Sequence, residues 1–202
     1  MHHQIKTAVL MVGIFTTTLL VGCASNEVKY DDAGAVETMN TDFGSTDLQQ
    51  VAEKMVDSLL TFPPIIEATQ QRRPVMFVDK IKNKTSEHID TESITDTISS
   101  RVLRSGKFRF VDMTKVQDVQ KQLEFQNESG SVNPETAAKM GRQIGAEYML
   151  YGNLSSIVKS SGSSKDVYYK FTLKVMQVES GIIEWSDEKE IRKTSKKSLF
   201  GR

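Results

Sequence analysis

Residues of the types that carry out most enzyme chemistry are scarce in this chain. Its 202 residues include one cysteine, Cys23, and three histidines, His2, His3 and His88. A zinc site built from cysteine and histidine therefore has too few ligands. A Ser-His-Asp triad would have to use His88, which stands in a polar turn where a solvated histidine is the expected state.

One short run is similar to the end of a phosphate-binding loop. Ser105-Gly106-Lys107 has the glycine and the lysine of such a loop. However, Phe108 stands where the loop needs serine or threonine, and Arg101 stands where its first glycine belongs. The pattern therefore does not support nucleotide binding.

Acidic residues cluster near the C-terminus, at Asp187, Glu188 and Glu190. Because paired carboxylates can hydrolyse a glycosidic bond, a peptidoglycan hydrolase is an open alternative. The three acids alternate with Lys189 and Arg192, which is typical of a solvated strand edge. We therefore expect a protein that is not an enzyme and has no catalytic residues, metal or other cofactor.

Cys23 has a different expected role. It directly follows the only long apolar run, Thr7 to Gly22, which is too short for a membrane span of about 20 residues and ends in small residues. This pattern predicts that residues 1–22 are a secretory signal. The run Leu20-Val21-Gly22-Cys23 resembles a bacterial lipobox, which implies that Cys23 is lipidated and becomes the mature N-terminus.

The same resemblance predicts a location. Ala24 and Ser25 follow Cys23, and neither is an aspartate of the kind that retains lipoproteins at the inner membrane. The resemblance therefore implies lipid anchoring in the outer membrane, on its periplasmic side, and more than one acyl chain makes such an anchor stable. An uncleaved membrane anchor is the alternative.

A flexible linker is expected between the cysteine and the folded part, because residues 24–44 are small, acidic and polar without a sustained period. We therefore divide the chain into a signal peptide (1–22), a lipidated N-terminus with a flexible linker (23–44) and a single globular domain (45–202). The chain has 26 basic and 26 acidic residues, so no global field favours nucleic acid as a partner.

Apolar residues at helical spacing predict four helices in the domain. The helices are expected from Ser45 to about Leu60, from Asp90 to Gly106, from Thr114 to about Phe125 and from Asn133 to Gly145. Pro63-Pro64 is expected to stop the first one.

Strand-like patterns fill the rest of the domain. They are Pro74 to Ile81, Lys107 to Phe110, Glu147 to Val158, Asp166 to Val178 and Ile182 to about Ile191, with a turn at Asn83-Lys84-Thr85. The order of elements predicts an α+β fold, a small, mostly antiparallel sheet of four to five strands with helices packed against it. The basic tail, Lys189 to Arg202, is interpreted as a frayed end in preference to a docking segment.

The strand from Asp166 to Val178 carries the candidate binding surface. Tyr168, Lys170, Thr172 and Lys174 alternate with apolar residues, so they share the face that points away from the core. Tyrosine beside basic residues is a common interface composition. Our hypothesis is that these four residues bind an acidic surface of a partner, and an ordinary solvated face is the alternative.

Several short runs share their order and spacing with one known family. They are Ser105-Gly106-Lys107-Phe108, Phe110-Val111, Gln122-Leu123, Gly141, Ile144-Gly145-Ala146, Tyr148-Met149-Leu150-Tyr151 and Gly181 to Ser186. Through these runs the chain, from Pro74 onward, resembles the penicillin-binding protein activator LpoB family.

The resemblance implies a function and a partner. Members of this family are outer-membrane lipoproteins that bind the non-catalytic docking domain of a class A bifunctional penicillin-binding protein, of the penicillin-binding protein 1B type. The expected function is therefore that of a non-catalytic regulator, an enzyme activator in peptidoglycan synthesis and cell wall biogenesis. The linker lacks the proline-rich stretch of enterobacterial members. A structural or secretion-associated envelope lipoprotein of related fold is the alternative.

Overall fold

The structure is a computed structural model, and it describes residues 28–113, 115, 116, 118, 119, 121 and 145–197. The chain forms two compact units, residues 1–32 and 33–202, and every element below belongs to the second. This unit begins at Ala33, whereas the sequence pattern placed the start of the domain at Ser45. Cys23, the helix expected at 133–145 and most of the helix expected at 114–125 lie outside the described residues.

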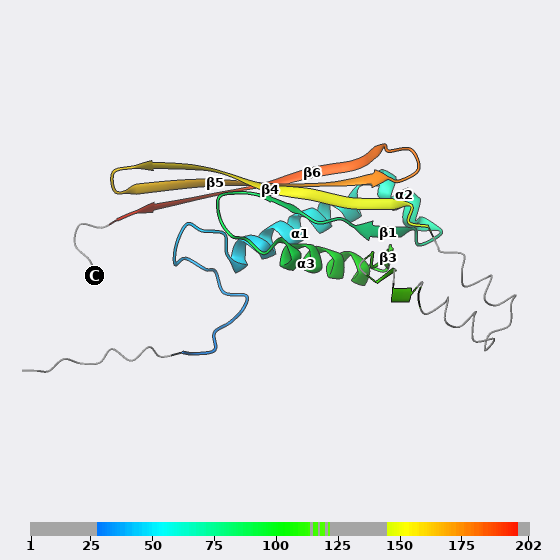
Figure 1. Cartoon of the computed structure of the whole chain (residues 1–202), viewed down its shortest axis with the longest axis horizontal. Helices are drawn as coiled ribbons and strands as arrows, with labels where there is room; N and C mark the ends of the chain where they lie inside the picture. Colours follow the sequence, from blue (N-terminus) through cyan, green and yellow to red (C-terminus); the bar gives the residue numbers. More distant parts are fainter. Residues whose placement is uncertain (1–27, 114, 117, 120, 122–144, 198–202) are drawn as a thin grey trace, which may run out of the picture. The chain divides into compact units, whose positions relative to one another are not determined.

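A mixed sheet of six strands forms one layer of the domain (Figure 1). The strands are β1 (Val75–Val78), β2 (Lys82–Lys84), β3 (Arg109–Val111), β4 (Tyr148–Ser161), β5 (Ser164–Gln177) and β6 (Ile183–Lys196). Their order is β3-β1-β4-β5-β6, and β2 pairs with β4 beside this path. Strands β4, β5 and β6 are antiparallel, whereas β1 is parallel to both of its neighbours and β2 is parallel to β4. The expected α+β class is confirmed, with a sheet that is mixed and has one strand more than expected.

The three long strands form because their sequences alternate with period two. The β5 residues that face the helices are each exposed by 1% or less, namely Val167, Tyr169, Phe171, Leu173 and Val175. Gly181 has a φ of 72° in the turn between β5 and β6, a conformation that glycine adopts without steric cost. Trp185 of β6 is 4% exposed and belongs to the same core, as its place on a late strand suggested.

Helices α1 (Ser45–Thr61) and α3 (Thr91–Arg104) lie on one side of the sheet (Figure 1). Helix α1 buries Val51, Met55 and Leu59, and α3 buries Ile94, Ile98 and Val102. As predicted, Asp90 caps α3, because its Oδ1 accepts hydrogen bonds from the backbone nitrogens of Glu92 (3.0 Å) and Ser93 (3.3 Å). Leu103 is apolar and lies next to Val102, but it is 47% exposed.

The structure corrects one expectation about the prolines. Pro63-Pro64 follows the end of α1 at Thr61 as predicted, but it also begins a second short helix, α2 (Pro63–Gln70). Proline at the first helical position loses no hydrogen bond and already has a helical φ, so it starts a helix as readily as it stops one.

Two expectations about strands are also corrected. Asn83 and Lys84, expected in a turn with Thr85, belong to strand β2 and pair with β4. The side-chain oxygen of Asn83 does accept a turn-like hydrogen bond from the Thr85 nitrogen at 2.9 Å. Strand β6 continues to Lys196, so most of the basic tail expected to fray from Lys189 is ordered. The end of β6 is a strand because β5 is equally long and pairs with it as far as Ser164 and Lys196.

Candidate functional site

The side of the sheet opposite α1 and α3 carries the four residues that the sequence singled out. We call it the open face because neither of these two helices covers it. Tyr168, Lys170, Thr172 and Lys174 are all partly exposed on β5, while the residues between them are buried in the core. The hypothesis that these four residues share one face away from the helices therefore agrees with the strand geometry.

Strand β6 changes the charge of the open face. Lys170 forms an ion pair with Glu188, and the pKa of Lys170 is raised because it donates a hydrogen bond to this carboxylate. The pKa of Tyr168 is raised too, mainly by a hydrogen bond to Glu190. The face is therefore a ladder of mixed charge, and the basic surface expected from β5 alone is half neutralised by its neighbour.

The ladder continues toward the free end of the strands. Arg192 of β6 makes two hydrogen bonds to the carboxylate of Asp166 on β5, from Nε at 3.0 Å and from a terminal nitrogen at 2.5 Å. This pairing lowers the pKa of Asp166. At the other end, Lys174 lies opposite Ser186 and Tyr151, and among the described residues it forms no ion pair. Lys174 is thus the member of the predicted set whose charge is available to a partner.

An apolar row crosses the open face beside Lys174, and the sequence did not reveal it. Its members are register partners on five neighbouring strands: Val111, Phe77, Met149, Met176 and Ile183. The first four are partly exposed and Ile183 is 47% exposed. Phe77 lies in a run, Val75 to Val78, that is apolar on both faces of the strand. The sequence alone therefore does not show which face of the sheet Phe77 occupies, and only its register with β4 does.

The candidate site is therefore the open face, with the apolar row at one end and the charged ladder beside it. Aromatic and methionine side chains are enriched at the centres of protein interfaces, whereas lysines and paired charges suit a rim. The arrangement is suited to protein binding. Within the described residues, no group of three or more His, Cys, Asp and Glu side chains is placed to hold a metal ion.

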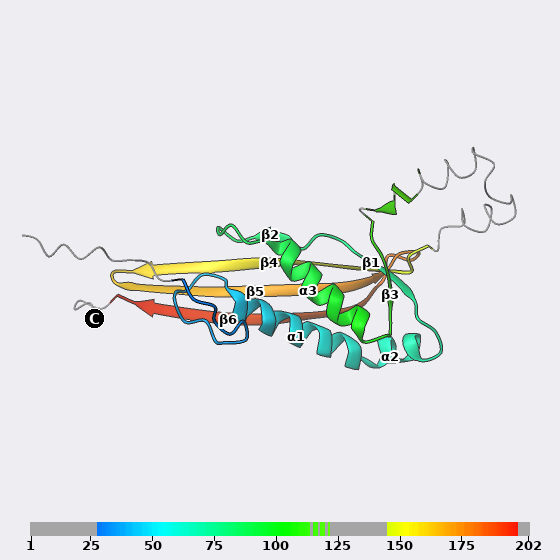
Figure 2. The same ribbon diagram turned by 90° about the horizontal axis from the view of Figure 1, so that it is seen from below.

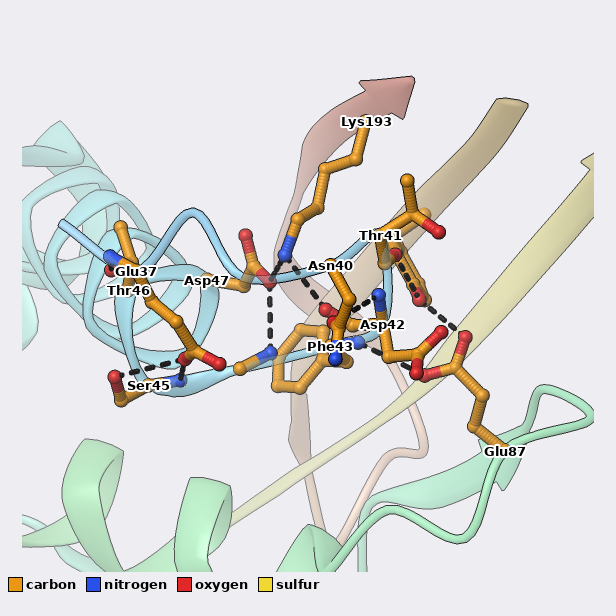
Figure 3. A network of polar contacts seen from close by, with 12 residues as sticks. Glu37, Asn40, Thr41, Asp42, Phe43, Ser45, Thr46, Asp47, Glu87 and Lys193 are labelled. Carbon is orange, nitrogen blue, oxygen red and sulfur yellow. Dashed lines mark hydrogen bonds and ion pairs between the residues drawn. The ribbon is translucent and has the colours of Figure 1, made fainter. Parts of the chain in front are cut away.

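A polar network fixes the segment that enters α1 (Figure 3). Lys193 of β6 donates to Oδ2 of Asp47 at 2.8 Å and to the carbonyl of Asp42 at 2.7 Å, and the nitrogen of Gly44 donates to the same Asp47 oxygen at 2.9 Å. Asp47 is 3% exposed, so this is a largely buried ion pair. It joins α1 to β6.

Tyr169 completes the network from the core. Its hydroxyl donates to the carbonyl of Thr41 at 3.0 Å and also contacts Oε1 of Glu87. The other oxygen of Glu87 accepts from the nitrogen of Phe43 at 2.9 Å, and the Phe43 ring packs edge-to-face on Tyr169 with centroids 5.7 Å apart. Burial and the Glu87 carboxylate raise the pKa of Tyr169. Residues 41–44, expected to belong to the linker, are thus held by the domain.

His88 and the acids of β6 do not form a catalytic group. His88 is exposed in the turn before α3, as expected for a solvated histidine. Asp187 points to the helix side, where it binds Lys54 of α1 at 2.8 Å, while Glu188 and Glu190 lie on the open face. The three neighbouring acids are therefore divided between two faces. No helix in the described part of the chain is long and apolar enough to cross a membrane.

Comparison with known proteins identifies a family. A family model described as "Peptidoglycan-synthase activator LpoB" matches residues 47–191. Among curated proteins, the chain is 26% identical over 121 residues to a penicillin-binding protein activator LpoB of Dickeya dadantii, covering 60% of this chain and 58% of that protein. It is 25% identical over 112 residues to the protein of that name from Escherichia coli, covering 55% and 49% respectively. The match to these two relatives thus spans about half of their length.

Solved structures of the same name are also similar. The C-terminal domain of LpoB from Escherichia coli aligns with a TM-score of 0.44 and 21% identity, covering 72% of this chain and 98% of that one. The corresponding domain from Salmonella enterica aligns with a TM-score of 0.43 and 20% identity over the same shares.

Proposed function

Because this chain belongs to the peptidoglycan-synthase activator LpoB family, we propose that it is a non-catalytic regulator that activates a class A bifunctional penicillin-binding protein. The partner in this proposal is a synthase of the penicillin-binding protein 1B type, bound through its non-catalytic docking domain. The observation that carries the proposal is the family match over residues 47–191, which includes the whole of α3, β4 and β5 and all of α1 but its first two residues.

The open face is the part of the chain that we assign to docking. Its apolar row supplies surface from which a partner can exclude water. Lys174, which forms no ion pair with any described residue, supplies a positive charge beside the row. An activator without catalytic groups works by binding the active conformation of its target more tightly than the inactive one. A preference of about 1.4 kcal/mol multiplies the ratio of active to inactive synthase roughly tenfold.

The proposal includes lipid anchoring at Cys23 to the periplasmic side of the outer membrane. The unit that holds the sheet and the helices begins at Ala33, so we take residues 24–32 as the tether. Nine residues span at most about 30 Å when fully extended. The activator is therefore expected to work close to the membrane that holds it, and the docking domain of the synthase has to come to it.

The proposal is tested by the rate of glycan polymerisation. A purified class A synthase in detergent is given fluorescent lipid II with and without the mature chain, and we expect the chain to raise the initial rate. Lys174→Glu should raise it less, whereas Arg104→Glu, at an exposed residue of α3 on the helix side of the sheet, should act like wild type. An unchanged rate at saturating wild-type chain would overturn the proposal. Release of soluble fragments from sacculi by the chain alone would favour a hydrolase.

A further inference from the structure

A groove runs beside α3, mainly on the helix side of the sheet, and at the edge strand β3 it reaches Val111 of the apolar row. It has a volume of about 720 Å³ and lies between α3 and the segments that follow β1 and β3. Figure 2 shows α1 and α3 next to each other against the sheet, with β1 and β3 at one end. Residues of α3 line the groove and residues of α1 do not, so the groove lies along α3 away from its contact with α1.

The floor of this groove is apolar. Val78, Ile89 and Phe110 line it and are partly buried against the core, while Leu103 and Met113 line it with 47% and 52% of their surface exposed. Val111 is the sixth apolar residue of the lining. A single exposed leucine is ordinary, but six large apolar side chains in one groove form a patch that can bind another apolar surface.

The wall that α3 contributes is low and smooth. Thr91, Thr95 and Ser99 line it at intervals of four residues, the spacing of one ridge along a helix. The hydroxyls of Thr95 and Ser99 donate to backbone carbonyls of α3 itself, at 2.8 and 2.6 Å. These hydroxyls therefore do not need a partner's hydrogen bonds, and their small side chains allow a second helix to approach closely.

The rim of the groove is acidic. Five of its lining residues are acids, Asp79, Asp90, Glu92, Asp96 and Asp112, and Lys80 is the one lysine or arginine among the residues that line it. The formal charge is therefore −4 when His88 is neutral. An apolar floor with a rim of one sign attracts an amphipathic helix whose flanks carry the opposite sign.

We propose that this groove binds a cationic amphipathic α-helix of a partner protein. Helix α3 has 14 residues and is therefore about 21 Å long, so a partner helix of three to four turns covers it. The apolar stripe of the partner packs on Leu103, Phe110 and Met113, and its lysine or arginine side chains meet Glu92 and Asp96. This inference goes beyond the proposed synthase activation, and its test does not use a synthase.

The test uses two synthetic peptides of 18 residues with the same leucine stripe, one flanked by lysines and the other by glutamates. Their binding to the mature chain is followed by fluorescence anisotropy. The lysine peptide is expected to bind and the glutamate peptide is not. Failure of the lysine peptide to bind wild type, or equal binding of both peptides, would overturn the proposal.

Matched variants distinguish binding in the groove from attraction to negative charge elsewhere on the protein. Glu92→Lys combined with Asp96→Lys on α3 should weaken binding of the lysine peptide about tenfold. Glu53→Lys with Asp57→Lys makes the same change at the same spacing on exposed positions of α1, outside the groove, and should change binding less than twofold. Equal weakening by both pairs would show attraction to net charge and contradict a groove.

An apolar variant provides the second control. Leu103→Ser should weaken the lysine peptide, whereas Ile66→Ser, at an apolar residue of α2 that is 41% exposed, should not. Because both residues are exposed, neither change should alter the melting temperature by more than a few degrees. Unchanged affinity in Leu103→Ser would mean that the floor of the groove takes no part.

Discussion

Replacing Asp47 by alanine is the sharpest test of what holds the domain together. The carboxylate is 3% exposed and accepts from Lys193 and from the nitrogen of Gly44. Its loss leaves the Lys193 ammonium, whose side chain is only 18% exposed, without a counter-ion, and it also leaves a helix-entry nitrogen unpaired. Breaking a buried pair costs about 3 to 5 kcal/mol, and the partial exposure of Lys193 places this case near 3 kcal/mol. For a domain of this size the melting temperature should fall by roughly 6 to 12 °C.

The assay is urea denaturation followed by circular dichroism. Glu53→Ala, which removes an exposed acid of the same helix, is the control and should change the free energy of unfolding by less than about 0.5 kcal/mol. The double variant Asp47→Ala with Lys193→Met should be less destabilised than the sum of the single changes, by at least about 1 kcal/mol. An additive double variant, or a cost below about 1 kcal/mol for Asp47→Ala, would refute the reasoning.

Three further predictions concern the core, the acid side of the pH range and the anchor. Trp185→Ala should cost about 3 to 5 kcal/mol in urea denaturation, since the ring is 4% exposed, and an unchanged midpoint would remove Trp185 from the core. The hydrogen bond from Arg72 lowers the pKa of Glu147 in the folded protein below its ordinary 4.5. The ionised carboxylate therefore stabilises the fold at any pH above the pKa that Glu147 has in the unfolded chain. This stabilisation is lost as the pH falls through the lower pKa of the folded protein. The melting temperature of Glu147→Gln should therefore fall less than that of wild type below about pH 5, and parallel curves would contradict this. Cys23→Ser should leave the outer-membrane fraction, and retention there after a high-salt wash would exclude the lipid anchor.

The long antiparallel strands could be predicted because their signal is local. Along β5 every second residue from Val167 to Val175 is apolar, and this alternation alone assigns Tyr168 and Lys174 to the other face. The cap of α3 at Asp90 is equally local. Patterns within a single stretch of sequence therefore predicted where these elements lie and which of their side chains face the core.

What depends on partners across the sheet could not be predicted in this way. The end of β6 has no apolar period, and it is a strand only because β5 pairs with it as far as Lys196. The ion pair of Lys170 with Glu188 and the position of Phe77 beside Met149 both depend on the register between strands distant in sequence. The sequence consequently located the candidate surface but misjudged its charge.

The buried pair of Asp47 and Lys193 shows the same limit. The sequence places Asp47 on the polar side of a helix and Lys193 in a basic tail, so both side chains are expected to be solvated. Only the packing of α1 against β6 brings them together, 146 positions apart along the chain.

The open face as the docking surface is tested most directly by nuclear magnetic resonance. The isotope-labelled mature chain is titrated with the isolated non-catalytic docking domain of the synthase, and its amide signals are followed. We expect the signals of Lys174, Met149 and Met176 to shift or broaden first, while those of α1 change little. Saturable binding that leaves these three signals unchanged would contradict docking at the open face.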